Sequence, residues 1–132
     1  MKGLISMSHA ATKVSKAIFA SLAALTLVSA ITACAASDKI DMAKVTSVID
    51  VRTADEFVAG HLEGAINYDV ESSGFVAQVS ALDTSGTYVL YCHSGRRAGI
   101  ALDAMKTMGF KNLTNAGGID AASAATGLAI VQ

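Results

Sequence analysis

Cys92 is the residue of this 132-residue chain whose surroundings best fit covalent chemistry. An apolar run predicted to be a strand, residues 87–91, ends directly before it, and a helical pattern begins a few residues after it. At such a junction loop N–H groups and a helix N-terminus converge, and both lower the pKa of a thiol and favour the nucleophilic thiolate. A small buried structural cysteine is the alternative. We predict that Cys92 is a nucleophile.

The loop that follows this cysteine has the composition of an anion-binding site. Its residues are His93, Ser94, Gly95, Arg96 and Arg97. The backbone N–H groups of the loop and the two arginines would together hold an anion against the sulfur. Either arginine could instead be a solvated surface charge. His93 could lower the thiol pKa when protonated, but we expect its side chain to point to solvent.

The first 34 residues are typical of an export signal. Residues 1–16 carry three lysines and no acid, and the 17 residues from 17 to 33 carry no charge. A basic lead before an uncharged core and small residues indicates a secretory signal, and a core of this length is marginal for a permanent membrane anchor. Met7 is an alternative start. We predict a leader over residues 1–34 and one folded domain over residues 35–132.

Cys34 ends a segment, residues 31–34, that resembles the lipobox of bacterial lipoproteins. We favour acylation of Cys34, with ordinary cleavage near residues 33–35 as the alternative. By either route the domain leaves the cytoplasm, so we expect it in the periplasm or lipid-anchored in the bacterial cell envelope, with no other membrane contact. An acylated Cys34 leaves Cys92 as a lone thiol, which cannot form an intramolecular disulfide. If Cys34 stays free, a Cys34–Cys92 disulfide is conceivable.

Charge and cysteine usage exclude several classes of partner and cofactor. From residue 35 onward the chain has seven basic and eleven acidic residues, a net charge of −4. An acidic body argues against nucleic acid, which requires basic patches. There is no two-cysteine redox motif and no Cys/His cluster for a metal. We therefore expect no metal, no cofactor and no nucleic-acid partner.

Strand and helix patterns alternate along residues 45–127. We predict strands at 45–49, 65–68, 87–91 and 112–114. Thr53 and Glu56 have the spacing of a capping box and start a helix that ends near Gly60, a helical segment follows at 75–82, and a third helix runs from the cysteine loop to Gly109. We also predict a turn at 83–86 and a loop at 115–118. We expect Ile100, Ala101, Met105 and Met108 to share the buried face of that helix. The small-residue segment 121–127 predicts loose packing.

This alternation predicts an α/β fold with a small parallel sheet and helices on both faces. Ligands of such sheets bind beyond the carboxyl ends of the strands, and Cys92 lies at one of those ends. We see no internal repeat and no low-complexity linker.

Three spaced segments resemble rhodanese domains. They are residues 48–67, which contain Asp50-Val51-Arg52, Glu56-Phe57 and Gly60-His61-Leu62-Glu63-Gly64-Ala65, the loop region 89–97, and residues 110–118 with their Gly-Gly turn. The resemblance covers about residues 40–120 in the expected order. It is strongest to small exported single-domain rhodaneses of the phage-shock-protein type, which share a Cys-x-x-Gly-Arg loop.

The resemblance implies a thiosulfate sulfurtransferase that uses no cofactor. Cys92 would attack the outer sulfur of thiosulfate, become a persulfide and pass that sulfur to cyanide or a thiol. The N–H groups of residues 93–97 would cradle the persulfide, and Arg96 or Arg97 would bind the anion and stabilise the leaving sulfite. Asp50 would accept loop hydrogen bonds, Arg52 would form an ion pair, and His61 would be a packing residue. We expect a monomer.

Two alternatives stay open. The first is a non-catalytic module on the same scaffold that binds anions or a protein partner. The second is a phosphatase or arsenate reductase of the Cdc25 type, which places its arginine six positions after the cysteine, where this chain has Ala98. The chain also departs from the rhodanese pattern at Leu62-Glu63, where the family has Ile-Pro, and at Ile119, where it often has tryptophan.

Overall fold

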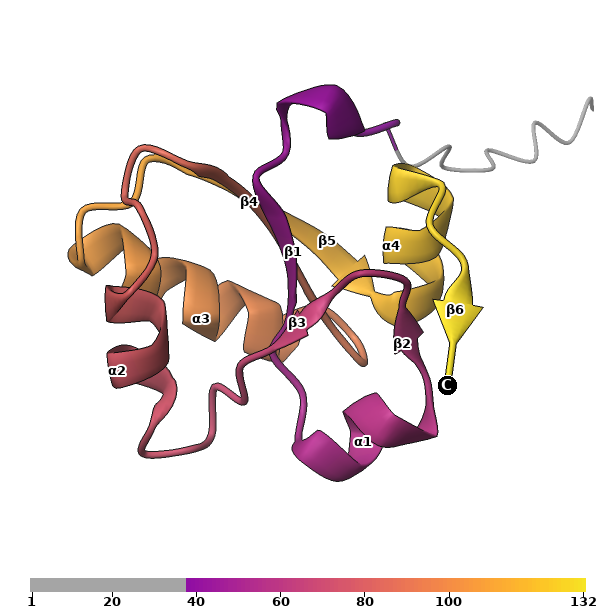
Figure 1. Ribbon diagram of the computed structural model, residues 1–132, viewed down its shortest axis with the longest axis horizontal. Helices are drawn as coiled ribbons and strands as arrows, with labels where there is room; N and C mark the ends of the chain where they lie inside the picture. The colour runs from indigo at the N-terminus through magenta and orange to yellow at the C-terminus, as the bar shows by residue number, and fades with distance from the viewer. Residues whose placement is uncertain (1–37) are drawn as a thin grey trace, which may run out of the picture. The chain divides into compact units, whose positions relative to one another are not determined.

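A four-stranded parallel sheet with the order β3-β1-β4-β5 forms the centre of the fold (Figure 1). The computed structural model describes residues 38–132. The sheet consists of β1 (Ser47–Asp50), β3 (Ile66–Asn67), β4 (Thr87–Cys92) and β5 (Asn112–Gly118). Every pairing in it is parallel. The predicted α/β class with a parallel sheet is therefore confirmed.

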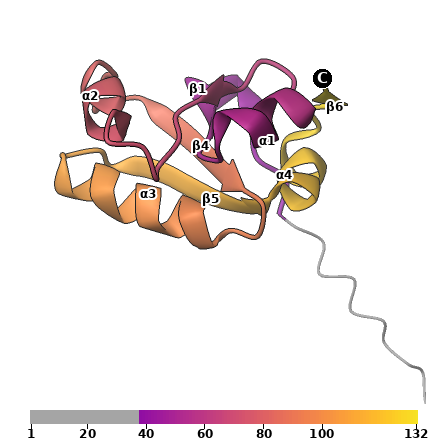
Figure 2. The ribbon, with the colours of Figure 1, turned by 90° about the horizontal axis from the view of Figure 1, so that it is seen from below.

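Within residues 38–132, four α-helices and three shorter elements surround this sheet. The helices are α1 (Ala54–Ala59), α2 (Phe75–Ser80), α3 (Arg96–Thr107) and α4 (Ile119–Thr126). A 3-10 turn, η1 (Met42–Lys44), precedes β1, and β2 (His61–Leu62) pairs antiparallel with β6 (Ile130–Val131). In Figure 2 α2 and α3 lie together at one end, and α1 and α4 lie at the other.

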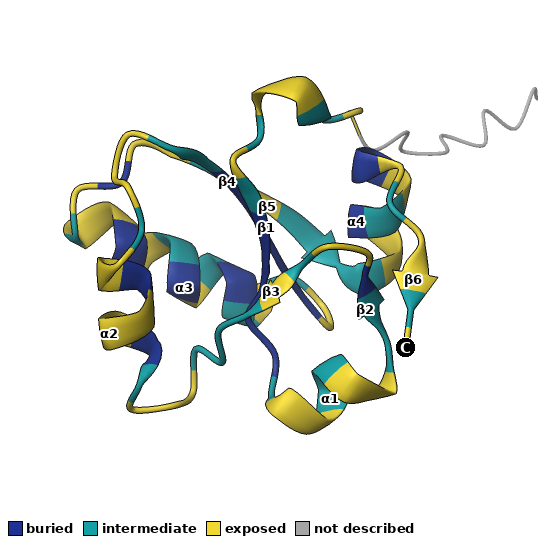
Figure 3. Cartoon of the chain, viewed as in Figure 1, coloured by how far each residue is buried: buried dark blue, intermediate teal, exposed yellow. Residues whose placement is uncertain are grey.

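Alternation along β4 divides the core between the two faces of the sheet. Tyr88, Leu90 and Cys92 belong to the apolar cluster that contains α2 and α3, whereas Val89 and Tyr91 belong to the cluster that contains α4. Successive side chains of a strand point to opposite faces, so a central strand covered on both sides is buried at every position. Figure 3 shows this burial along β4 and on the inner side of α3. Helices on both faces are thus confirmed.

Several local predictions are confirmed by the hydrogen bonds. Thr53 Oγ1 accepts the Glu56 N–H at 3.3 Å, and Glu56 Oε2 accepts the Thr53 N–H at 3.2 Å, so the capping box at α1 is complete. The backbone N–H of Gly86 donates to the carbonyl of Asp83 and closes the predicted turn. Gly109 follows α3 with a left-handed φ of 100°, as expected of a helix stop.

Three predictions about the second half of the chain are wrong. Residues 115–118 are not a loop but the end of β5, because Asn115 and Gly118 pair with Leu90 and Cys92 of β4. Ile100 is 50% exposed, and the buried face of α3 is formed by Ala98, Ala101 and Met105.

Residues 121–127 do not pack loosely. They belong to α4 and its C-cap, and Ala122, Ala125 and Thr126 are buried against the sheet side of that helix. Alanine has the highest helix propensity, and its small side chain lets the helix lie close to the sheet. The small residues therefore indicate close packing at this position.

The leader over residues 1–34, the start at Met7 and the acylation of Cys34 lie outside the described residues. Within residues 38–132, no helix has the length and apolar character that a membrane span requires.

Candidate active site

Cys92 is the last residue of β4 and is fully buried. Its side chain lies on the face of the sheet that packs against α3. Gly95, three residues later, donates its N–H to Cys92 Sγ at an N–Sγ distance of 2.9 Å. Gly95 has a left-handed φ of 93° and caps the start of α3, and this conformation suits glycine. The tight turn brings the loop back over the sulfur.

Backbone dipoles around Sγ favour its ionised form. Burial raises the pKa of the Cys92 thiol, but the nearby backbone N–H groups of Ala98, Ser94, Gly95 and Arg97 lower it by more, so that it falls below the ordinary thiol value. Of these groups, the Gly95 N–H forms a hydrogen bond to the sulfur. The donors belong to the loop and the first turn of α3. This convergence of N–H groups is the geometry predicted from the strand–cysteine–helix pattern.

The end of β5 holds the back of the loop. Asn115 Nδ2 donates to the carbonyl of Gly95 at 3.0 Å, and Asn115 Oδ1 accepts the N–H of Gly117 at 2.9 Å. A Cβ on Gly118 would overlap the carbonyl oxygen of His93, so the loop and β5 approach as closely as glycine allows. Sequence reasoning missed Asn115 as a site residue, because its segment has the composition of a loop.

The two arginines of the loop have different surroundings. Arg96 is exposed, and within residues 38–132 no carboxylate pairs with it. The Arg97 guanidinium binds Glu56 with two hydrogen bonds, at 2.7 and 2.8 Å, and approaches Glu71 at 3.4 Å. Its pairing with Glu56 raises the pKa of Arg97, and the same bonds lower the pKa of Glu56 to about 2. The loop thus presents one free and one neutralised cation.

Asp50 and Arg52 form a buried ion pair at the carboxyl end of β1. Arg52 Nη2 lies 2.6 Å from Asp50 Oδ2, and Arg52 Nε donates to both carboxylate oxygens. Arg52 Nη2 also donates to the carbonyl of Gly60, which anchors the end of α1. The predicted ion pair of Arg52 is confirmed. Asp50 Oδ1 also accepts the N–H of Arg52 at 2.9 Å, so the hydrogen bonds of the Asp50 carboxylate are formed with Arg52 and not with residues 93–97.

The histidines near the site are placed as packing and surface residues. The His61 ring stacks on Phe57 with centroids 3.8 Å apart, and its Nδ1 lies 2.9 Å from the Phe57 carbonyl oxygen. This confirms the packing role expected for His61. His93 and Ser94 are exposed at the turn of the cysteine loop.

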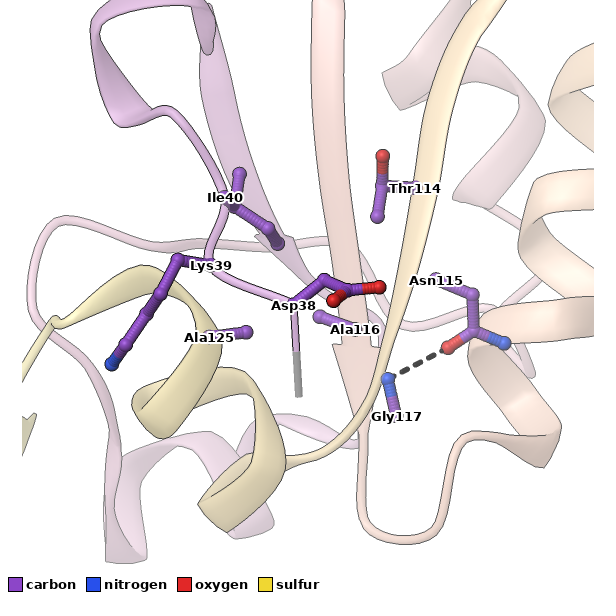
Figure 4. Close-up of a pocket in the computed structure, with 8 residues that line it drawn as sticks. All are labelled: Asp38, Lys39, Ile40, Thr114, Asn115, Ala116, Gly117 and Ala125. Atoms are coloured by element: carbon purple, nitrogen blue, oxygen red, sulfur yellow. Dashed lines mark hydrogen bonds between the residues drawn. The ribbon is translucent and has the colours of Figure 1, made fainter. Parts of the chain in front are cut away.

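A pocket of about 460 Å³ lies on the other side of the β5 end (Figure 4). It is lined by Asp38, Lys39, Ile40, Thr114, Asn115, Ala116, Gly117 and Ala125. None of residues 92–97 lines it. It shares only Asn115 and Gly117 with the packing behind the cysteine loop, so it is not the cavity in which a substrate would meet Sγ.

Comparison with known proteins identifies the family. The model of the Rhodanese-like domain family matches residues 32–125. Thiosulfate sulfurtransferase PspE of Escherichia coli strain K12 is 32% identical over 71 residues, which are 54% of this chain and 68% of that protein.

Solved structures agree with this family. A rhodanese with anions from Escherichia coli is similar with a TM-score of 0.55 and 28% identity, over 65% of this chain and 96% of that one. Protein hp1203 of Helicobacter pylori 26695 is similar with a TM-score of 0.55 and 26% identity, over 70% of this chain and 82% of that one. The fold, the cysteine loop at the end of β4 and the family match lead to one conclusion: this chain belongs to the rhodanese family.

Proposed function

We propose that this protein is a thiosulfate sulfurtransferase that carries sulfur as a persulfide on Cys92. Membership of the rhodanese family implies substrates that donate and accept sulfur in general. The observation that carries the specific proposal is the hydrogen bond from the Gly95 N–H to Cys92 Sγ, together with the lowered pKa of this thiol beside the start of α3, because both favour the thiolate that such a reaction needs. The name of the Escherichia coli relative agrees with this choice of donor.

The reaction has two balanced steps. In the first, the Cys92 thiolate attacks the outer sulfur of thiosulfate. The S–S bond of the donor breaks, its electron pair leaves with sulfite, and the enzyme becomes a persulfide anion. In the second, cyanide or a thiolate attacks the outer sulfur of the persulfide, a new bond to the acceptor forms, and the Cys92 thiolate is released. The N–H groups that hold the thiolate would also stabilise the persulfide anion.

We assign Arg96 to binding the SO₃ group of thiosulfate, the end of the donor that leaves as sulfite. A thiolate and a thiosulfate dianion repel each other, so the site needs a positive charge that is free to bind the donor. Arg97 is occupied by Glu56 and Glu71, whereas Arg96 is exposed at the start of α3. Because Cys92 is fully buried, the donor also needs a local movement of the exposed loop residues to reach Sγ.

Intact mass of the full-length protein tests this function. After thiosulfate treatment we expect a gain of one sulfur, about 32 Da, that cyanide removes and that Cys92→Ser lacks. A Cys34→Ser parent ensures that Cys92 is the one thiol that can react. If the parent gains no sulfur from thiosulfate while its thiol is alkylated by iodoacetamide, the proposed donor is wrong. If Cys92→Ser retains full sulfur transfer, the proposed nucleophile is wrong.

We also propose that the protein works in the bacterial cell envelope, either in the periplasm or anchored through lipid on Cys34. The support is the basic, then uncharged leader and the lipobox-like segment before Cys34. Metabolic labelling with an alkyne fatty acid tests the anchor. Label in the wild-type protein but not in Cys34→Ser is expected, and an unlabelled wild-type protein in the soluble envelope fraction would favour ordinary cleavage.

A further inference from the structure

We propose that Glu56 and Glu71, together called the carboxylate clamp, set the donor selectivity of this site by neutralising Arg97. With the clamp in place, Arg96 is the loop cation that no carboxylate of residues 38–132 pairs with. The clamp would therefore limit the preference for dianionic donors such as thiosulfate over monoanionic ones such as methanethiosulfonate. This inference rests on the proposed sulfur transfer at Cys92.

The clamp contacts Arg97 with the geometry of a strong ion pair. Glu56 receives both guanidinium NH₂ groups, one on each carboxylate oxygen, at 2.7 and 2.8 Å. Such bidentate pairs are the strongest arginine–carboxylate contacts. Arg97 is only 15% exposed and Glu56 is 34% exposed, so water screens this pair less than a surface pair. Glu71, 57% exposed and 3.4 Å away, adds a second and weaker contact.

The Glu56 carboxylate cannot move with Arg97 toward a substrate, because hydrogen bonds from Thr53 hold it in place. Its Oε2 accepts hydrogen bonds from the N–H and from the Oγ1 of Thr53, at 3.2 and 3.0 Å. These bonds are part of the capping box at the start of α1. The same carboxylate therefore fixes a helix start and a guanidinium 41 residues away in the chain. For Arg97 to turn to a donor it would have to leave a rigidly placed partner.

Charge near the sulfur decides how strongly each donor is attracted. Arg97 stands in the first turn of α3, five residues after Cys92, so its charge lies on the same loop-to-helix junction as the sulfur. The two arginines and the two clamp carboxylates sum to zero net charge, whereas the two arginines without the clamp charges sum to +2. A dianion gains more than a monoanion from each added positive charge, because Coulomb energy scales with the product of the charges. Removing the clamp should therefore favour thiosulfate selectively.

The test compares two donors on the same protein variants. Thiosulfate leaves as sulfite, and methanethiosulfonate leaves as methanesulfinate, and each gives the same Cys92 persulfide. The full-length Cys34→Ser protein is the parent, and Glu56→Gln/Glu71→Gln removes the clamp charges while keeping the side-chain shapes. The measured quantity is the ratio of kcat/KM for thiosulfate to that for methanethiosulfonate, with cyanide as acceptor. Damage to the fold lowers both values and leaves the ratio unchanged.

We expect the ratio to rise by about tenfold in the clamp variant, the order of effect that Coulomb's law gives for charges near a solvent-exposed site. The matched control is Asp55→Asn/Glu63→Gln, which removes two exposed carboxylates for which no ion pair is formed within residues 38–132, and its ratio should not change. Glu71→Gln alone keeps the capping box and should raise the ratio less. It serves as the second variant if the double variant does not fold.

Three results would overturn the inference. The ratio could stay unchanged in the clamp variant, it could rise equally in the Asp55/Glu63 control, or the rise could persist when Arg97→Ala is added to the clamp variant. Each would show that Arg97 is not masked by the clamp.

A measurement without sulfur transfer separates this inference from the proposed function. If the parent transfers sulfur from neither donor, the proposed function fails, but Cys92 can still be alkylated. Iodoacetate is an anion and iodoacetamide is neutral, so the ratio of their alkylation rates reports the charge at the sulfur. This ratio should rise in the clamp variant and not in the control. An unchanged alkylation ratio would refute the masking of Arg97 independently of catalysis.

Discussion

The close approach of β5 to the cysteine loop leads to a sharp prediction about Gly118. Gly118 has φ of −78° and ψ of 167°, a conformation that alanine adopts without strain. The one obstacle to a side chain is steric: a Cβ would overlap the carbonyl oxygen of His93 and lie 3.2 Å from its carbonyl carbon. Gly118→Ala must therefore push the loop away from the sheet.

The size of the effect follows from this overlap. The atoms that this Cβ would meet belong to the backbone of the cysteine loop, and backbone cannot rotate away as a side chain does. We expect the free energy of unfolding to fall by about 1–3 kcal/mol, the usual cost of overpacking a close contact. The displaced loop also carries the Gly95 N–H that bonds Cys92 Sγ at 2.9 Å. Sulfur transfer should fall by about a hundredfold, since a shift of about 1 Å in a reacting group has effects of that order.

The assay pairs Gly118→Ala with Gly74→Ala. Gly74 has a similar φ of −81°, and its Cβ would meet only Ser72 Oγ at 3.5 Å, an ordinary contact. Gly74→Ala should therefore keep its activity and change stability by less than about 1 kcal/mol. Chemical denaturation, thiosulfate–cyanide kinetics and the pH midpoint of Cys92 alkylation are measured for both. Wild-type activity and an unchanged alkylation midpoint in Gly118→Ala would refute the view that β5 positions the loop.

Three further predictions concern the thiol, the buried ion pair and the core. Alkylation of Cys92 should have a pH midpoint below that of an ordinary thiol, and it should be lost as the pH falls through this lowered pKa. A midpoint at or above the ordinary value would contradict the stabilisation of the thiolate by backbone N–H groups. Arg52→Ala leaves Asp50 buried and unpaired and should cost about 3–5 kcal/mol in denaturant unfolding; a loss below about 1 kcal/mol would mean that water reaches the carboxylate. Met105→Ala should cost about 2–5 kcal/mol by the same measurement, whereas Ile100→Ala should stay within about 0.5 kcal/mol, and equal losses would place both on the core face.

The sheet and its reactive end could be predicted from the sequence because they depend on local patterns. The apolar run before Cys92 marks a central strand, and it is buried at nearly every position in the structure. Thr53 and Glu56 have the spacing of a capping box, which involves only neighbouring residues, and both of its hydrogen bonds form. The turn at Gly95 and the helix after it follow from glycine and from the helical pattern.

The rest depends on tertiary contacts that local patterns do not encode. Ile100 is large and apolar, so its spacing predicts a core position, but the helix turns its small Ala98 and Ala101 toward the sheet. Residues 115–118 have turn composition, and their pairing with β4 overrides it. β2 and β6 have two residues each, too few for an alternating pattern.

The partner of Arg97 was also beyond local reasoning. Glu56 lies 41 residues away and Glu71 lies 26 residues away in the chain. Glu56 was recognised for its place in the capping box, and nothing in that motif indicates a second bond to a distant guanidinium. Which of two adjacent arginines is free is decided by the face of α3 on which each stands.

The strand order of the sheet also sets when the thiol becomes reactive during folding. The sheet has the strand order β3-β1-β4-β5, and all neighbouring strands in it are parallel. Parallel neighbours cannot be joined by a tight turn, so none of these pairs can form as a local hairpin. Non-local parallel pairing of this kind slows folding. Until α3 starts at Gly95 and β5 supports the loop, the sulfur lacks its N–H donors and is an ordinary thiol. The lowered pKa of Cys92 should therefore appear late in refolding, so a shift of its alkylation midpoint to lower pH reports the final assembly of the domain.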